Sequence, residues 1–280
     1  MRKWNLIIDI EKCEDCNNCF LACKDEHVDN EWPGYTEAQP RHGHRWINIL
    51  RKERGQFPLI DVAYRPTPCQ HCDDAACIAR DDSQAVFKRA DGVVLIDPQK
   101  AKGQKQLVKA CPYGAIWWNA EKNVPQKCTL CAHLLDSGWS QPRCVQACPT
   151  GAMQMVKVED EAMIRLATTE RLKVLSPELG THSRVYYKNL HRFENCFIAG
   201  SVAIDSDGVM DCVQGAAVVL KQEDQITDQV QTNEYGDFKF DDLEPNSGTY
   251  ELEIIYKDLE KRTISIELTH SQSIENIVLS

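Results

Sequence analysis

The chain has 280 residues, of which 42% are hydrophobic and 26% are charged, and its formal net charge is −10. This composition is ordinary for a globular protein, and a chain of this length can bury a sizeable core in one to three domains. No apolar run approaches the roughly 20 residues that span a bilayer, which argues against a membrane-spanning segment.

The acidic charge is concentrated near the C-terminus. Residues 197–280 contain 17 acidic and 5 basic side chains, a net charge of −12, whereas residues 1–196 have a net charge of +2. This balance argues against nucleic-acid binding, and we expect the acidic residues to form a solvated surface. The first residues, MRKWNLIIDI, lack the long apolar region of a signal peptide. We expect a cytoplasmic protein, with export on a signal-bearing partner left open.

Short strands and short helices are expected along residues 1–157. The pattern predicts strands over residues 1–10, 93–96, 115–118 and 152–157, and short helices that begin near Cys19, Leu107 and Cys144. Residues 24–68 form a long insertion without a regular pattern, and such loops usually carry function or contact a partner. Residues 158–196 form a connecting segment that includes a candidate helix, EDEAMIRLATTERL.

From residue 197 the pattern changes to short runs of alternating apolar residues separated by turns. About seven such runs predict an all-β sandwich or barrel over residues 197–280. Gly236 in NEYGDFKF is predicted to lie in a tight turn before an alternating strand. This part has no evident catalytic residues, and we expect Cys196 and Cys212 to be buried small hydrophobic side chains.

Twelve of the 14 cysteines lie between residues 13 and 148. A long chain with several C-x2-C pairs favours metal binding over disulfides. The first group has the spacing C-x2-C-x2-C-x3-C of bacterial two-cluster ferredoxins, in which three cysteines bind one [4Fe–4S] cluster and the fourth binds another. The groups are Cys13, Cys16, Cys19 and Cys23; Cys69, Cys72, Cys77 and the distant Cys111; and Cys128, Cys131, Cys144 and Cys148.

Zinc is the main alternative metal, because paired cysteines also form structural zinc sites. Three closely spaced cysteines plus a fourth fit zinc poorly, whereas twelve cysteines divide into three sets of four, and Cys111 and Cys148 each precede proline. Covalent haem attachment needs C-x-x-C-H, which neither CQHCD nor CTLCA provides.

Two features near the cysteines have simpler explanations than ligation. His42 and His44 in RHGHRW are expected to be surface or packing residues rather than metal ligands. Trp117 and Trp118 are expected to pack beside a cluster, because an apolar shell controls the access of solvent to it.

The cysteine layout resembles that of the electron-transfer subunits of molybdopterin oxidoreductases of the dimethyl sulfoxide reductase family. Those subunits usually have four ferredoxin motifs and four [4Fe–4S] clusters. Here four ligand positions of that pattern are occupied by other residues: Asp81, Ala101, Gln104 and Leu107. In the family these four positions would bind one cluster, so the resemblance implies that one cluster is missing as a unit and three remain.

In that family the first and fourth motifs exchange their last cysteines, and the second and third motifs do likewise. The resemblance therefore implies three ligand sets in this chain. They are Cys13, Cys16, Cys19 and Cys148 for the first cluster; Cys128, Cys131, Cys144 and Cys23 for the second; and Cys69, Cys72, Cys77 and Cys111 for the third.

Further segments are similar to the small subunits of pyrogallol–phloroglucinol transhydroxylases, a branch that includes anaerobic resorcinol hydroxylase and the catechol dehydroxylases. These segments are DCNNCF, NEWPGY, GHRW, YRPTPC, QKCTLCAHLLD and RVYYKNLHRFE. The small subunit of such a transhydroxylase has three clusters and a C-terminal β domain. The similarity covers most of residues 1–196 and the general layout of the rest.

The predicted fold class is α+β. We expect a ferredoxin-like domain with three [4Fe–4S] clusters over residues 1–157, the connecting segment over 158–196, and an all-β domain of prealbumin-like or immunoglobulin-like type over 197–280. The β domain is expected to dock on a partner or to cover part of it.

The predicted function is that of an electron-transfer subunit without catalytic residues of its own. The resemblance implies a large catalytic partner that binds molybdopterin guanine dinucleotide with molybdenum or tungsten and transfers hydroxyl groups between polyphenols. The alternatives are the small subunit of a catechol dehydroxylase or a resorcinol hydroxylase, and a stand-alone polyferredoxin carrier. No nucleic-acid partner and no membrane segment are expected.

Overall fold

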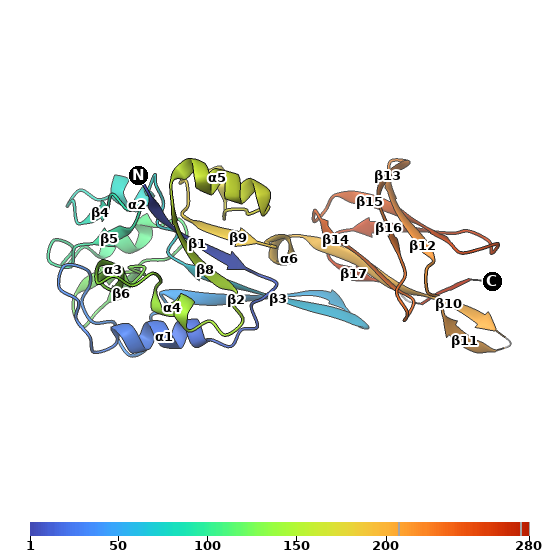
Figure 1. Cartoon of the computed structure of the whole chain (residues 1–280), viewed down its shortest axis with the longest axis horizontal. Coiled ribbons are helices and arrows are strands. Elements are labelled where there is room, and N and C mark those ends of the chain that lie inside the picture. Colours follow the sequence, from blue (N-terminus) through green and yellow to red (C-terminus); the bar gives the residue numbers. More distant parts are fainter. Residues whose placement is uncertain (207, 275, 280) are drawn as a thin grey trace. The chain divides into compact units, whose positions relative to one another are not determined.

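The computed structural model describes residues 1–206, 208–274 and 276–279, and the chain divides into two compact units (Figure 1). Unit 1 comprises Met1–Leu50 and Tyr64–Leu190, and unit 2 comprises Arg51–Ala63 and His191–Ser280. Helices and strands are both present, as the α+β class requires. No helix among the described residues is both long enough and apolar enough to cross a membrane.

A three-stranded sheet lies in unit 1, with β1 (Lys3–Asp9) at its centre. β8 (Met153–Val158) pairs antiparallel with β1, and β9 (Val185–Lys188) pairs parallel with it. Six of the seven residues of β1 are buried, which fits the nearly continuous apolar run of a central strand. The strands predicted over residues 1–10 and 152–157 are confirmed.

Two small hairpins and several short helices make up much of the rest of unit 1. β4 (Val86–Lys88) pairs with β5 (Val94–Ile96), and β6 (Trp117–Asn119) pairs with β7 (Val124–Gln126). The helices are α1 (Asn18–His27), α2 (Ala76–Ala79), the 3₁₀ helix η1 (Lys105–Ala110), α3 (Ala132–Asp136) and α4 (Arg143–Gln146). The helices predicted near Cys19, Leu107 and Cys144 therefore correspond to α1, η1 and α4.

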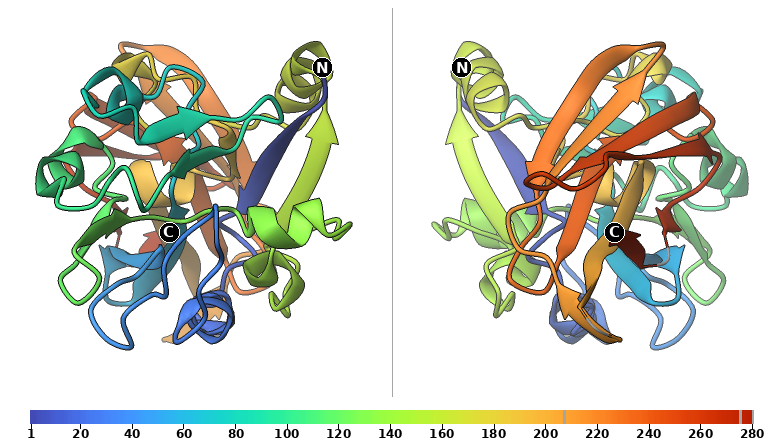
Figure 2. Two further views of the ribbon diagram at one scale, coloured as in Figure 1. Left: turned by 90° about the vertical axis from the view of Figure 1, so that its left-hand side faces the viewer. Right: turned by 90° about the vertical axis from the view of Figure 1, so that its right-hand side faces the viewer.

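The candidate helix after β8 is also present, as α5 (Asp160–Thr169). Its first turn lies beside the N-terminus of β1 (Figure 2). There Asp160 forms ion pairs with Lys3 at 2.8 Å and with Arg184 at 2.7 Å. A carboxylate in the first turn also favours the helix, because the N-terminal end of a helix carries a partial positive charge. A short 3₁₀ helix, η2 (Pro177–Leu179), follows.

The prediction that residues 24–68 form a long irregular insertion is wrong in part. β2 (Ile47–Gln56) and β3 (Leu59–Pro68) pair with each other as two ten-residue strands. The sequence INILRKERGQ does not suggest a strand, because its charged side chains are expected to be exposed to solvent. Arg54 is in fact buried and ion-paired, with 1% of its side chain exposed. The outer part of this hairpin, Arg51–Ala63, belongs to unit 2.

Two sheets form most of unit 2, and α6 (His191–Glu194) precedes them. In the first sheet, β10 (Cys196–Ser206) pairs antiparallel with β11 (Val209–Cys212) and β14 (Asp237–Leu243), and parallel with β17 (Gln272–Ser273) and β18 (Ile277–Leu279). The second sheet has the order β13 (Gln225–Gln231), β12 (Ala217–Gln222), β15 (Gly248–Ile255) and β16 (Arg262–Leu268).

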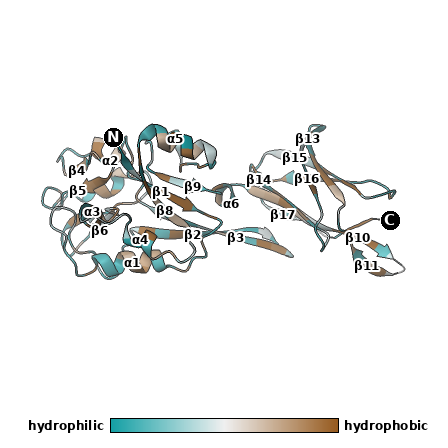
Figure 3. Ribbon diagram, viewed as in Figure 1, coloured by the Kyte–Doolittle hydropathy of each residue, from teal (hydrophilic) through white to brown (hydrophobic). Residues whose placement is uncertain are grey.

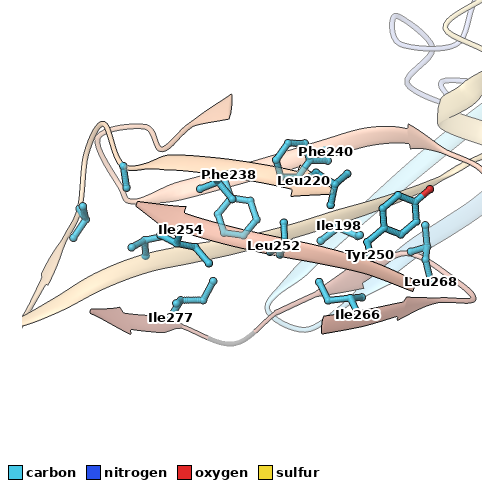
Figure 4. Packing of buried hydrophobic residues seen from close by; sticks show 14 of the residues in the cluster. Ile198, Leu220, Phe238, Phe240, Tyr250, Leu252, Ile254, Ile266, Leu268 and Ile277 are labelled. Atoms are coloured by element: carbon cyan, nitrogen blue, oxygen red, sulfur yellow. The ribbon is translucent and has the colours of Figure 1, made fainter. Parts of the chain in front are cut away.

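One hydrophobic core joins the two sheets of unit 2. Hydrophobic and hydrophilic residues alternate along its strands (Figure 3). Apolar side chains from both sheets, including Phe238 of β14 and Leu252 of β15, form a single buried cluster (Figure 4). Where the structure describes them, residues 196–279 form nine strands rather than about seven, and β11 and β17 are short additions to the expected pattern.

Gly236 lies in a turn with a φ of +80°, directly before β14, as predicted. We expect Gly236→Ala to lower the melting temperature of the protein clearly. Two costs combine: the left-handed backbone is unfavourable for alanine by roughly 1–2 kcal/mol, and the new Cβ would press on the carbonyl oxygen of Val202 and approach the amide nitrogen of Val213 to 3.2 Å.

Gly215 provides a matched control, because it has a φ of +78° and an added Cβ there would meet no atom of the described residues within 4 Å. Gly215→Ala tests the backbone cost alone, so its melting temperature should fall less than that of Gly236→Ala. Equal decreases in melting temperature for the two variants, measured by differential scanning fluorimetry, would show that the close contact at Gly236 does not affect stability.

Candidate iron–sulfur sites

Three C-x-x-C loops share one local backbone conformation. The residue before the second cysteine has a positive φ in each: 54° at Asp15, 45° at His71 and 55° at Leu130. The amide of His71 donates a hydrogen bond to Cys69 Sγ at 3.5 Å. The amide of Leu130 likewise donates to Cys128 Sγ at 3.4 Å. Because hydrogen bonds to the sulfurs tune an iron–sulfur cluster, these turns suit its thiolate ligands.

Four cysteines from separate parts of unit 1 line one small cavity. They come from α1, from the loop before α3 and from α4, and they are Cys23, Cys128, Cys131 and Cys144. Apolar side chains, including Leu6, Trp46 and Ile47, form much of the remaining wall. The structure thus brings together the four thiols that the family resemblance implies for the second cluster.

A second small cavity is lined by four other cysteines. They are Cys69, Cys72 and Cys77, which are close in sequence, and Cys111, which follows η1. The amide of Ala115 donates to Cys111 Sγ at 3.5 Å, so the distant cysteine also receives a backbone hydrogen bond. These are the thiols that the resemblance implies for the third cluster.

The first set lies closest to the surface. Cys16 is exposed, Cys13 and Cys148 are partly buried, and Cys19 is buried. Their thiols lie close enough to affect one another, since the pKa of Cys19 is raised to about 12 by burial and further by its neighbours Cys13, Cys16 and Cys148. Cys148 therefore lies near the cysteines of the N-terminal loop, although it is far from them in the sequence.

Burial raises the pKa of thiols in all three sets. It raises the pKa of Cys77 to about 12 and that of Cys128 to about 11, and in each case Cys69 adds to the effect. The pKa values of Cys23 and Cys144 are raised well above the ordinary value, first by burial and then by neighbouring thiols. Ionising four such thiols around one cavity requires a positive centre among them, and iron provides one. The donor sets therefore fit iron–sulfur clusters.

A single zinc ion suits these sites less well. Structural zinc needs four ligand atoms at about 2.0–2.3 Å from one point. Among the described residues, no group of three or more cysteine, histidine or acidic side chains is gathered tightly enough to hold one metal ion. Four thiols spread around a cavity match a cluster, whose several iron atoms each take one thiolate.

The positions at which the family pattern has a fourth set of cysteine ligands are part of the ordinary fold in this chain. Ala101 and Leu107 are 0% and 1% exposed and lie in a hydrophobic cluster with Val86 and Val94. Asp81 accepts hydrogen bonds from the amides of Ser83 at 3.0 Å and Val86. Side chains of a small apolar core and a carboxylate that holds a turn thus occupy three of the four positions at which the family pattern would have further ligands.

Replacing Leu107 tests whether this position is simply part of the core. We expect Leu107→Ala to destabilise the protein by about 2–3 kcal/mol, because it leaves a cavity in a closed cluster. The iron content should stay unchanged, as it should in Lys109→Ala, a control on the same 3₁₀ helix that lies outside this cluster. Iron analysis and thermal unfolding check both points, and a loss of iron in Leu107→Ala would contradict this interpretation.

The simpler explanations of His42, His44 and Cys196 hold, whereas that of Cys212 does not. His44 is buried and its Nε2 lies 2.9 Å from the carbonyl oxygen of Trp118, while His42 is exposed, so both are packing or surface residues. Cys196 is buried as predicted. Cys212 is exposed, and the prediction for it is wrong, because all four residues of β11 are exposed.

Sequence reasoning missed a group of polar side chains behind the cysteines. His27 is 1% exposed, and its Nε2 lies 3.8 Å from Cys131 Sγ. Burial, followed by the neighbouring His133, lowers the pKa of His27 to about 3, so its imidazole is neutral. His133 in turn hydrogen-bonds Glu26 at 2.9 Å. Glu26 and His27 lie more than 100 residues from Cys131 and His133, so spacing gave no indication that they meet.

Comparison with known proteins agrees with this description. A family described as the 4Fe-4S dicluster domain matches residues 60–158. The chain is 50% identical over 257 residues to the pyrogallol hydroxytransferase small subunit of Pelobacter acidigallici, with 91% of each chain covered.

More distant relatives share the iron–sulfur part. The chain is 31% identical over 193 residues to a subunit of the tetrathionate reductase of Salmonella typhimurium, with 67% of this chain and 73% of that protein covered. It is 29% identical over 232 residues to the iron–sulfur subunit of the arsenate respiratory reductase of a Shewanella species, with 65% and 94% covered. The chain therefore belongs to the family of iron–sulfur electron-transfer subunits of molybdopterin oxidoreductases, in the branch of the pyrogallol hydroxytransferase small subunit.

Proposed function

We propose that the chain holds three [4Fe–4S] clusters and relays single electrons for a large molybdopterin-binding subunit that acts on hydroxylated aromatics. The observation that carries this proposal is that two cavities are each lined by four cysteines from separate segments. The favoured reaction is hydroxyl transfer between polyphenols, supported by 50% identity to a pyrogallol hydroxytransferase small subunit. The alternative is a related catechol dehydroxylase or resorcinol hydroxylase.

In this proposal each cluster has four cysteine ligands, divided as the family pattern implies. Cys13, Cys16, Cys19 and Cys148 hold the first cluster; Cys23, Cys128, Cys131 and Cys144 hold the second; and Cys69, Cys72, Cys77 and Cys111 hold the third. The common lining of two cavities supports the second and third sets. The mutual effect of the thiols on their pKa values supports the first set.

The protein's own residues position the clusters and set their surroundings. A bound [4Fe–4S] cluster supplies reversible one-electron transfer. The amides of His71, Leu130 and Ala115 donate to cysteine sulfurs, and such bonds stabilise the additional negative charge of a reduced cluster. Trp46 and Ile47, which are 2% exposed, keep water from the second site and so influence its potential.

We further propose a ferredoxin-like domain over residues 1–157, a connecting segment over 158–196 and a prealbumin-like β domain over 197–280. Two sheets around one core support the last of these. The β domain would dock on the large subunit rather than take part in electron transfer. A cytoplasmic location is supported by the free thiols, because an exposed free cysteine such as Cys212 is typical of a reducing compartment.

Anaerobic purification of the native complex, with analysis of iron, acid-labile sulfide, molybdenum and tungsten, tests this proposal. We expect about twelve iron atoms per copy of this chain, together with a co-purifying large subunit that contains molybdenum or tungsten. A chain that purifies alone with its iron would favour a stand-alone carrier. Zinc without acid-labile sulfide would end the iron–sulfur assignment.

A further inference from the structure

His71 is a buried histidine inside a cysteine motif, between Cys69 and Cys72. It is 2% exposed and lines the cavity of the third ligand set. Its backbone φ of +45° is unusual for a residue with a side chain. The same turn that directs its amide to Cys69 Sγ also places its imidazole on the cavity wall.

The hydrogen bonds around His71 determine which ring nitrogen carries the proton. The amide of Val94 in β5 donates to Nδ1 at 3.1 Å, so Nδ1 presents a lone pair. The proton of the imidazole must then lie on Nε2. Nε2 is buried and has no hydrogen-bond partner among the described residues. Leaving a buried donor without an acceptor is unfavourable, so such groups nearly always have a partner.

Lys127 brings a second donor to the same cavity from a different segment. It is 3% exposed and its ammonium donates to the carbonyl oxygens of Val94 and of Cys128, the latter at 3.0 Å. The positive charge acts on two thiols of the third set, because it opposes the rise of the pKa of Cys77 and of Cys111. The cavity therefore gathers groups that favour negative charge inside it.

We propose that His71 Nε2–H donates a hydrogen bond to a sulfur of the cluster held by Cys69, Cys72, Cys77 and Cys111, and that this bond raises the reduction potential of that cluster. The inference rests on the proposed function, because it takes the third ligand set to hold a cluster. Reduction adds negative charge to the cluster, so a donor aimed at its sulfur stabilises the reduced form more than the oxidised form.

Two substitutions test the roles of the two ring nitrogens of His71 separately. His71→Asn keeps an acceptor for the amide of Val94, since the asparagine oxygen takes the place of Nδ1, but it removes the donor at Nε2. His71→Gln can present a donor at the position of Nε2. Both variants are studied in the intact complex by EPR-monitored redox titration, with iron analysis of each preparation.

We expect His71→Asn to lower the midpoint potential of one cluster and to leave the other two unchanged, and His71→Gln to restore part of this shift. Unchanged potentials in an iron-complete His71→Asn complex would overturn the inference, as would a shift confined to another cluster. Failure of the proposed function looks different, because the unmodified complex would then lack the iron of a third cluster.

A second measurement leaves His71 unsubstituted, and it tests the inference if both His71 variants lose the cluster. His27 and His71 are the histidines that line the two cysteine-lined cavities. A His27→Gln complex that contains histidine labelled with 15N only in the imidazole ring therefore leaves His71 as the labelled ring at such a cavity, and the amide of His71, which donates to Cys69 Sγ, gives no 15N signal. Pulsed EPR of the reduced complex should then detect a 15N coupling, and its absence would overturn the inference.

Discussion

Replacing Cys23 with alanine should remove the cluster of the Cys128 loop, although Cys23 lies in the N-terminal motif. We expect Cys23→Ala to lose the [4Fe–4S] signal of the second cluster and up to about four iron atoms per chain. The first cluster, with three ligands from the same motif, should keep its signal. Iron analysis and EPR of the reduced complex measure both effects.

The reason lies in how α1 and α4 carry their cysteines. Cys19 and Cys23 are four residues apart on α1, which separates them by about 6 Å along the helix axis. Cys144 lies on α4 and Cys148 lies two residues beyond its end at Gln146, and the two helices contact each other. Each of these two segments would therefore supply a thiol to two sites. The thiols that raise the pKa of Cys144 are, from the largest effect to the smallest, Cys131, Cys128, Cys23 and Cys19, whereas the pKa of Cys19 is raised by Cys13, Cys16 and Cys148.

Two controls make the result specific. Cys148→Ala is the reciprocal change and should remove the first cluster while sparing the second. Cys212→Ala removes an exposed cysteine that belongs to none of the sets, so iron content should stay complete. If Cys23→Ala instead abolished only the cluster of the Cys13 loop, the exchange of cysteines between motifs would be disproved.

The local part of the sites could be predicted from the sequence because it depends on short spacings. A C-x-x-C turn brings its amide and its sulfur together within a few residues, as in the loops of His71 and Leu130. The pairing of Cys23 with Cys144 could not be obtained in this way, because it depends on contact between distant helices. It followed only from family resemblance.

The features that sequence reasoning missed share a physical cause. The role of His71 depends on the amide of Val94, 23 residues away, and no periodic pattern encodes such a bond. The β2–β3 hairpin was missed because its charged side chains suggested solvent exposure, whereas Arg54 is buried among carboxylates. Cys212 was misassigned because it lies on a short added strand rather than in the core. Tertiary contacts decided all three cases.

Removing the charge of Arg54 should give the largest loss of stability that we predict. Its guanidinium donates to Asp61 and to Asp241 at 2.9 Å, and 1% of its side chain is exposed. Arg54→Met would remove the most buried partner of Asp61 and Asp241, which keep ion pairs with Arg192 and Lys239. Breaking a buried ion pair typically costs up to about 3–5 kcal/mol. Denaturant unfolding of the purified protein, followed by circular dichroism of its β structure, measures this loss.

Two other variants show whether the loss of stability comes from the buried hydrogen bonds that the Arg54 guanidinium donates. Arg54→Lys keeps the charge but not the planar pair of donors, so it should be intermediate. Lys261→Met removes an ion pair with Glu253 in which the lysine is about half exposed, and it should cost less than about 1 kcal/mol. A loss below that level for Arg54→Met as well would contradict a structural role for this network.

The pH dependence of the Arg54→Met penalty follows from Asp241, which loses Arg54 but keeps its ion pair with Lys239. Burial raises the pKa of Asp241, but hydrogen bonds from Arg54 and Lys239 outweigh it and lower the pKa to about 2. In the unfolded chain the pKa is about 3.9. A lowered folded pKa gives stability that is complete above the unfolded value and is lost as the pH falls toward the folded value. The difference in stability between wild type and Arg54→Met should therefore stay constant from about pH 8 to pH 5.5, where a change would point to a titrating group other than Asp241.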